Sequence, residues 1–115
     1  GGFDPADLRL DHFLGTLLAL GHPALARFHT VHAIIGVTEV FTVHPGHTVH
    51  PPLETGQTFS LLALHGPCCG ISVRDAAWEL DAAELASTEA RGLSNIAKEQ
   101  LMITVTSGVL TVVVP

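Results

Sequence analysis

The sequence has little charge of either sign, and basic residues are the scarcer kind. Charged residues make up 14% of the 115 residues, with five Lys and Arg against eleven Asp and Glu and a formal net charge of -6. Nucleic-acid binding depends on clustered Lys and Arg that neutralise phosphates, so this composition argues against a nucleic-acid partner. Because a soluble domain usually carries about 25% charged residues, the deficit predicts a surface partly covered by a partner, a second copy or another segment.

Long hydrophobic runs and targeting segments are also missing. No run approaches the roughly 20 apolar residues of a transmembrane helix, and the first residues lack the basic and apolar regions of a signal peptide. The only two cysteines, Cys68 and Cys69, are adjacent and cannot build a disulfide framework. We therefore expect a cytoplasmic protein without membrane association. Because the sequence lacks an initiator Met, we interpret it as the C-terminal part of a longer protein.

Hydrophobic residues, by contrast, are abundant enough for a folded core. They make up 47% of the chain, which is too apolar for disorder, and 115 residues correspond to one domain at about 100–200 residues per domain. A stripe at helical spacing predicts a helix over 7–20, ended by Gly21 and Pro23, and a short helical turn over 23–27. The stripe consists of Leu10, Phe13, Leu14, Leu17 and Leu18.

After the helical region, short β-rich runs alternate with turn residues. This pattern predicts a mainly β fold. We expect a jelly-roll-like antiparallel β-sandwich over residues 28–115, with the N-terminal helix in residues 1–27. Ser107-Gly108 predicts a tight hairpin between the last two strands, and residues 76–80 fit no single pattern. The expected strands are 31–35, 38–44, 48–50, 58–64, 70–73, 101–106 and 109–114.

Three histidines recur at every third residue in the segment His44-Pro-Gly-His47-Thr-Val-His50. Clustered imidazoles are common metal ligands. However, residues i and i+3 of a strand face opposite sides, and no acidic partner lies nearby in the sequence. We therefore favour exposed turn histidines and keep a metal-binding β-barrel as an alternative. Cys68 and Cys69 also point to opposite faces, which favours one packed in the core and one at its edge.

Three further signals are weak when taken singly. Arg9-Leu10-Asp11-His12 lies in the first turns of the helix, where an Arg fork suits phosphate and a carboxylate suits Mg²⁺ or a proton. A solvated first turn has the same composition. Ser94 and Asn95 offer a hydroxyl and an amide that can hydrogen-bond a ring nitrogen or amine, or simply form a turn. Trp78, the only Trp, can stack on a cationic ring or fill the core.

Taken together and in order, these short sequence motifs resemble those in the C-terminal half of the thiamine pyrophosphokinase (thiamine diphosphokinase) family. The resemblance covers nearly the whole chain. The matching phrases are Arg9 to His12, Pro45-Gly46-His47, Thr58 to Leu64 with Gly66-Pro67, Gly70-Ile71-Ser72, Trp78 to Asp81, Gly92 to Asn95, and Gly108 to Pro115.

The resemblance implies a β-sandwich that binds thiamine, following an α/β nucleotide-binding domain of which residues 1–27 are the remnant. It also implies a homodimer that transfers diphosphate from ATP to the thiamine hydroxyl with release of AMP, and that needs Mg²⁺. By this resemblance Arg9 and Asp11 are catalytic, Asp11 holds the metal, and Arg9 and His12 bind the nucleotide phosphates. Ser94, Asn95 and Trp78 bind thiamine.

The chain also departs from the family pattern. It lacks the family's acidic N-terminal cluster, and Arg74-Asp75-Ala76-Ala77 replaces the more usual residues before the Trp. We therefore expect that the 115 residues alone do not turn over ATP. The alternatives are a degenerate, non-catalytic sandwich that only dimerises and the metal-binding β-barrel.

Overall fold

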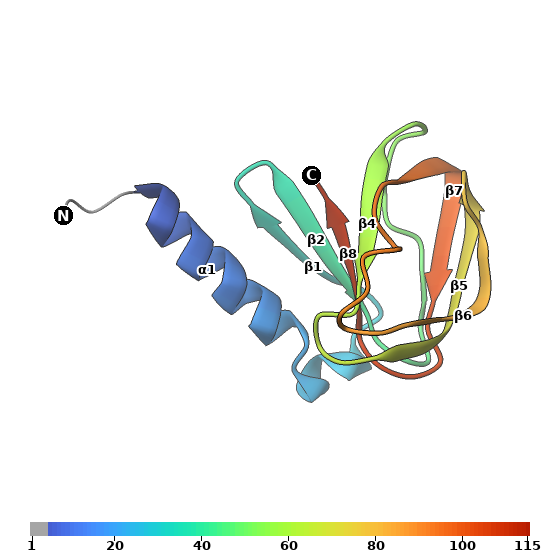
Figure 1. The fold of residues 1–115 in the computed structure, drawn as a ribbon, viewed down its shortest axis with the longest axis horizontal. Coiled ribbons are helices and arrows are strands. Elements are labelled where there is room, and N and C mark those ends of the chain that lie inside the picture. The colour runs from blue at the N-terminus through green and yellow to red at the C-terminus, as the bar shows by residue number, and fades with distance from the viewer. Residues whose placement is uncertain (1–4) are drawn as a thin grey trace.

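The computed structural model describes the fold of residues 5–115 and the side chains of residues 10–115. It is an antiparallel β-sandwich with one long N-terminal helix, which confirms the mainly β prediction (Figure 1). Among the described residues, no helix combines the length and the apolar character needed to cross a membrane.

The two helices lie where the sequence predicts them. The long helix α1 spans Pro5–Leu20, and the 3-10 helix η1 spans Pro23–Arg27 after a turn in which the His22 ring accepts a hydrogen bond from the Ala24 N–H (3.0 Å). Only part of the apolar stripe is buried: Leu17 packs against the sheet, whereas Leu10, Leu14 and Leu18 are 56%, 50% and 73% exposed. The helix therefore covers the sandwich with one narrow face.

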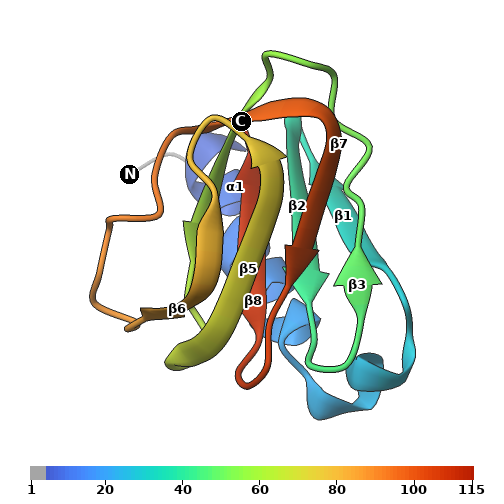
Figure 2. The same cartoon turned by 90° about the vertical axis from the view of Figure 1, so that its right-hand side faces the viewer.

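Two four-stranded layers form the sandwich, and every strand pair is antiparallel (Figure 2). The layers join at one edge, where the start of β4 pairs with the start of β7 through Phe59 and Asn95. The first layer has the order β1 (Val31–Ile35), β2 (Thr38–Val43), β8 (Leu110–Val114) and β4 (Thr58–Leu62). The second has the order β3 (Thr48–Val49), β7 (Asn95–Thr104), β5 (Cys68–Ala76) and β6 (Leu80–Leu85).

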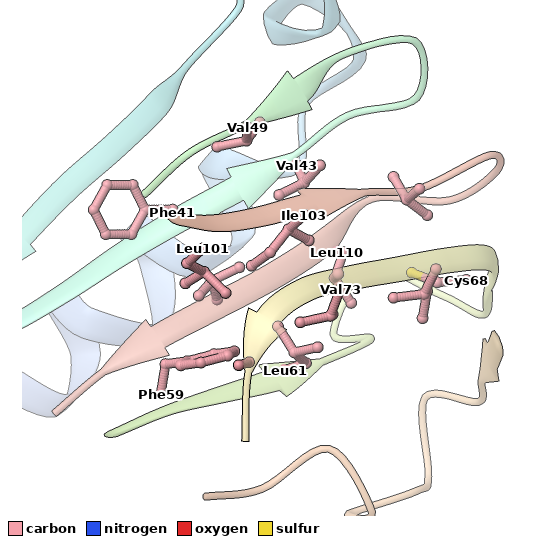
Figure 3. Packing of buried hydrophobic residues seen from close by; sticks show 14 of the residues in the cluster. Phe41, Val43, Val49, Phe59, Leu61, Cys68, Val73, Leu101, Ile103 and Leu110 are labelled. Carbon is pink, nitrogen blue, oxygen red and sulfur yellow. The ribbon is translucent and has the colours of Figure 1, made fainter. Parts of the chain in front are cut away.

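The main core lies between the two layers and is built from alternating β-branched, Leu and Phe side chains (Figure 3). A smaller cluster lies outside the first layer, where Leu17 and Leu20 of α1 meet Val31 and Val40. Strand β2 is therefore buried on both faces, because Phe41 faces the main core and Val40 faces the helix. This explains why four successive residues of β2 lose their exposure to water, against the alternation expected for a strand with one solvated face.

Three sequence-based predictions of strands need correction. The hairpin at Ser107-Gly108 is wrong, because β7 and β8 lie in different layers and the connection crosses between them. Ser107 pairs instead with Cys69, through N–H···O bonds of 3.0 and 3.1 Å. Strand β6 was not predicted, since its alanines and acidic residues have low β propensity. Strand β7 begins six residues earlier than 101, over a stretch whose charged side chains point to solvent.

Candidate functional site

Residues 86–94 form the long loop between β6 and β7 at the edge of the sandwich (Figure 2). A cavity of ≈ 400 Å³ opens there, where the loop contacts β4. An apolar recess of ≈ 110 Å³ adjoins it and extends toward Ile71 and Leu85 of the core. The cavity therefore has an apolar floor and a polar rim, the combination typical of small-molecule sites. Its lining residues are Leu61, Trp78, Leu80, Arg91, Gly92, Leu93, Ser94 and Asn95.

The three residues predicted to bind the ring system, Trp78, Ser94 and Asn95, all line this cavity. Trp78 lies in the turn between β5 and β6 with 60% of its surface exposed, so it is not the core aromatic of the alternative interpretation. Asn95 is 7% exposed at the start of β7. Its amide oxygen accepts hydrogen bonds from the N–H groups of Trp78 (3.1 Å) and Ile96 (2.8 Å), and its amide nitrogen donates to the Trp78 carbonyl (2.8 Å).

Ser94 stands in a left-handed backbone conformation immediately before β7. Its φ is 62°, a region that non-glycine residues enter rarely, and its backbone N–H donates to the Ser60 hydroxyl at 3.0 Å. The Ser60 bond ties this strained residue to β4. A residue held in such a conformation by its surroundings is a recurrent feature of binding sites.

Gly92 brings the loop into close contact with β4. Its carbonyl accepts the Leu61 N–H at 2.8 Å, and a Cβ at this position would stand 2.4 Å from the Leu61 carbonyl oxygen. Only glycine allows that approach, which explains why the phrase begins with Gly. Leu61 is 1% exposed and pairs with Val112 in the sheet, so the floor under the loop is rigid.

Arg91 was not singled out by the sequence, although it lines both the cavity and the recess. Its guanidinium pairs with Glu89 (2.7 Å) and donates to the Glu84 carbonyl. Glu89 also accepts the Ala86 N–H at 2.9 Å, so the two side chains close the loop upon itself. Arg91 belongs to no recognisable sequence motif, so the sequence alone does not indicate that it lines a cavity.

The predicted phosphate-binding residues lie elsewhere in the chain. Asp11 and His12 are exposed on α1, beside a shallow hollow between that helix and η1. Arg9 belongs to α1, but its side chain lies outside the described residues. Helix α1 covers the β1–β2 end of the first layer (Figure 1), whereas the residues that line the cavity belong to β4, to the β5–β6 turn and to the loop before β7. Within one chain, therefore, the fold does not bring Asp11 or His12 to Trp78, Ser94 and Asn95.

The three histidines of the 44–50 segment bind three different backbone carbonyls. The rings of His44, His47 and His50 pair with the carbonyls of Leu20 (3.3 Å), Ala26 (2.5 Å) and Leu101 (3.2 Å). In the part of the chain that the structure describes, no three His, Cys, Asp or Glu side chains are grouped to hold a metal ion. The metal-site alternative thus has no geometric support.

The expectation of exposed turn histidines is also wrong for His44, which is 2% exposed. Burial lowers the pKa of its imidazole below 6.5, although the Leu20 carbonyl acts in the opposite direction. The ring of His65 pairs with another carbonyl of the last turn of α1, that of Leu17, at 2.6 Å. These rings therefore fasten the C-terminal turn of α1 to the sandwich.

The two cysteines lie as predicted, one packed in the core and one outside it. Cys68 is fully buried in the main core, and Cys69 is exposed on the opposite face of β5. Burial raises the pKa of the Cys68 thiol, with a smaller contribution from Cys69. A buried thiol with a raised pKa is a poor nucleophile and a poor metal ligand.

Residues 46–110 match the family model described as thiamin pyrophosphokinase, vitamin B1 binding domain. This segment is more than half of the chain and contains every residue that lines the cavity. The chain belongs to the thiamin pyrophosphokinase vitamin B1-binding domain family. Comparison with curated protein sequences gives no match.

Solved structures share the fold of this vitamin B1-binding domain. Thiamine pyrophosphokinase from Bacillus subtilis superposes with a TM-score of 0.74 at 16% identity, over 99% of this chain and 51% of that one. A thiamin pyrophosphokinase family protein from Enterococcus faecalis gives 0.71 at 16% identity, over 91% and 49%. A Lactobacillus plantarum protein gives 0.67 at 20% identity, over 99% and 53%.

The chain thus spans about half the length of the solved structures that it matches. At these identities the similarity is one of fold. The match to the vitamin B1-binding domain begins at residue 46, after Asp11 and His12 and before Trp78. It therefore bears on the cavity and not on the predicted phosphate-binding residues.

Proposed function

We propose that the 400 Å³ cavity is the thiamine site of a thiamine diphosphokinase, the enzyme that transfers diphosphate from ATP to the thiamine hydroxyl with release of AMP. One observation carries this proposal: Trp78, Ser94 and Asn95 converge on a single cavity inside the segment that matches the vitamin B1-binding domain. The cavity suits the chemistry of thiamine, which has two flat rings and one positive charge.

Each part of the site has a distinct role in this proposal. The indole of Trp78, 60% exposed at the rim, offers a face to the thiazolium ring, where a cation–π contact contributes about 1–2 kcal/mol. Leu61 and Leu80 provide the apolar floor on which the rings lie. The Ser94 hydroxyl hydrogen-bonds a polar group of the substrate. Net acidity of the chain, with a formal charge of -6, favours approach of a cation.

The phosphate side of the reaction is proposed from the family resemblance. Arg9 and His12 would contact the nucleotide phosphates, and Asp11 would serve the reaction as one carboxylate ligand of Mg²⁺. The described residues do not by themselves make a magnesium site, because they place no second acidic side chain with Asp11 in a metal-binding group. We therefore derive no chemical step through the metal from this chain.

We further propose that turnover requires residues beyond these 115, since the chain spans half of each solved relative, and that the enzyme is a cytoplasmic homodimer. The exposed leucines of α1 support a partner surface, because contiguous exposed apolar side chains usually mark an interface. Sedimentation velocity tests the dimer: a monomer at every concentration would refute it.

Calorimetric titration with thiamine tests the binding function, with Trp78 fluorescence as a second signal. In the unmodified chain we expect heat of binding and quenching of the single Trp, and both should be kept in His22→Ala, a surface control outside the cavity. Trp78→Ala has no Trp left to follow, so it is tested by the heat of binding, and its affinity for thiamine should fall by about tenfold. Absence of both signals in the unmodified chain would overturn the proposal and favour a sandwich that only dimerises. Thiamine-dependent release of AMP from ATP, measured on a chain of the relatives' full length, tests the reaction.

A further inference from the structure

Asn95 uses its side-chain amide on the protein itself rather than presenting it to the cavity. An amide oxygen has two acceptor positions, and both are occupied, by the N–H groups of Trp78 at 3.1 Å and Ile96 at 2.8 Å. The amide nitrogen donates to the Trp78 carbonyl at 2.8 Å. The side chain is therefore left with a single unused N–H, and its oxygen cannot accept a hydrogen bond from a substrate amine.

The orientation of this amide follows from its partners. A backbone N–H can only donate and a backbone carbonyl can only accept, so the oxygen must face the Trp78 N–H and the nitrogen must face the Trp78 carbonyl. One side chain thus holds both polar groups of the Trp78 backbone. The Ala77 N–H adds a bond of 2.9 Å to the Ile96 carbonyl, which fixes the same turn to β7.

We call the hydrogen bonds from the Asn95 side chain to the Trp78 backbone the clamp. Asn95 is buried and fixed in the sheet, whereas the Trp78 side chain is exposed. Asn95 is 7% exposed and pairs across the sheet junction with Phe59, a fully buried residue of the core. Trp78 is 60% exposed, so its indole gains little support from core packing. The bonds from Asn95, with the Ala77 bond to Ile96, therefore fix the backbone from which the indole projects to the cavity rim.

We infer that Asn95 is a positioning residue, which sets the place of the Trp78 ring through the Trp78 backbone and does not read the substrate with its own amide. The effect on thiamine rests on the proposed function above; the effect on Trp78 does not. Preorganising an aromatic wall saves the entropy of ordering it when a ligand binds. Loss of the clamp should therefore weaken binding even though no ligand contact is removed.

The test follows the single Trp by time-resolved fluorescence anisotropy and by thiamine titration. Asn95→Ala should increase the fast, local component of the anisotropy decay. It should also weaken thiamine binding by about tenfold, because the freed ring must then be ordered when the ligand binds. The matched control is Thr42→Val, which removes another buried side-chain-to-backbone bond, from Thr42 to the Leu20 carbonyl, on the far layer. It should lower stability without changing either Trp78 signal.

Asn95→Asp tests whether Trp78 can be immobilised again at low pH, which a general loss of stability would not produce. Its carboxylate still accepts from the two N–H groups but repels the Trp78 carbonyl, whereas its protonated form regains a donor. Trp78 mobility in Asn95→Asp should therefore fall as the pH is lowered from about 6 to about 3, through the ordinary pKa of an Asp carboxyl, with no such fall in Asn95→Ala or the unmodified chain.

Unchanged Trp78 mobility in Asn95→Ala, or an equal change in Thr42→Val, would overturn the inference. Unchanged thiamine affinity in a variant with a mobile Trp78 would also overturn it. If the unmodified chain binds no thiamine, the proposed function fails by itself, and the anisotropy measurements still decide whether Asn95 holds Trp78.

Discussion

Gly92→Ala should separate the binding loop from the sandwich while leaving the fold intact. The added Cβ would stand 2.4 Å from the Leu61 carbonyl oxygen and 3.2 Å from the Leu61 Cβ. Ordinary contact begins near 3.4 Å, so the two backbones must separate by about 1 Å. Leu61 is held in the sheet by its pairing with Val112, and the loop is the part that must move.

The size of the effect follows from what that movement breaks. The Gly92 carbonyl accepts the Leu61 N–H at 2.8 Å, and a shift of about 1 Å takes the bond beyond hydrogen-bonding range. Losing this bond and relieving the clash should cost about 1–3 kcal/mol of stability. Ser94, two residues along, should move with the loop. We expect thiamine affinity to fall by more than about tenfold, because a displacement of this size misplaces the polar rim.

Chemical denaturation and calorimetric titration, run on the same preparations, measure the two quantities. Gly15→Ala is the matched control, since nothing lies within 4 Å of a Cβ at that helical position. This control should raise stability by up to about 1 kcal/mol and leave thiamine binding unchanged. A Gly92→Ala protein with normal stability and normal affinity would refute the close approach of the loop to β4.

Three further measurements test other parts of the structure. Trp78→Phe should retain part of the thiamine affinity that Trp78→Ala loses, because a smaller ring still offers a face; equal losses would argue against stacking. Because burial lowers the pKa of His44, the neutral ring is favoured in the folded chain. Stability is therefore complete above pH 6.5 and falls as the pH drops through that value toward the lower folded pKa. Urea midpoints at about pH 7.5 and about pH 5.5 should differ less in His44→Gln, and an equal difference would contradict this assignment. A thiol reagent should modify Cys69 in the folded chain and reach the buried Cys68 only after unfolding; simultaneous modification would contradict the burial of Cys68.

The strands that could be predicted are those whose signals are local. Strand β1 has the predicted bounds, 31–35, because a β-branched run ends at Gly36, whose φ is 62°. Strand β6 escaped prediction because its acidic residues and alanines carry no such signal. Its existence depends on pairing with β5, in a register shifted by bulges. The false hairpin at Ser107 has the same origin, since a turn signal shows that the chain reverses but not which strand it pairs with.

The candidate site could be predicted in its residue types but not in its hydrogen bonding. Trp78 and Asn95 lie 17 positions apart in the sequence with all of β6 between them, and no spacing rule relates them. The sequence suggested that the Asn95 amide reads the substrate, whereas the structure places that amide on the Trp78 backbone. His44 shows the same limit, because its burial arises from the docking of α1, an element more than twenty residues away.

The sequential order of the motifs therefore does not show which residues share a site. The structure shows it, because the turn that holds Trp78 and the loop that holds Ser94 line the same cavity. The resemblance predicts that Arg9 to His12 and Gly92 to Asn95 belong to one site. In the structure, however, helix α1 covers the β1–β2 end of the first layer (Figure 1), and the cavity opens where β4 meets β6 and β7. If Asp11 serves phosphate transfer to a substrate stacked on Trp78, the homodimer proposed above would have to bring the two residues together from different chains. The exposed leucines of α1 are the surface on which that proposed second chain would pack.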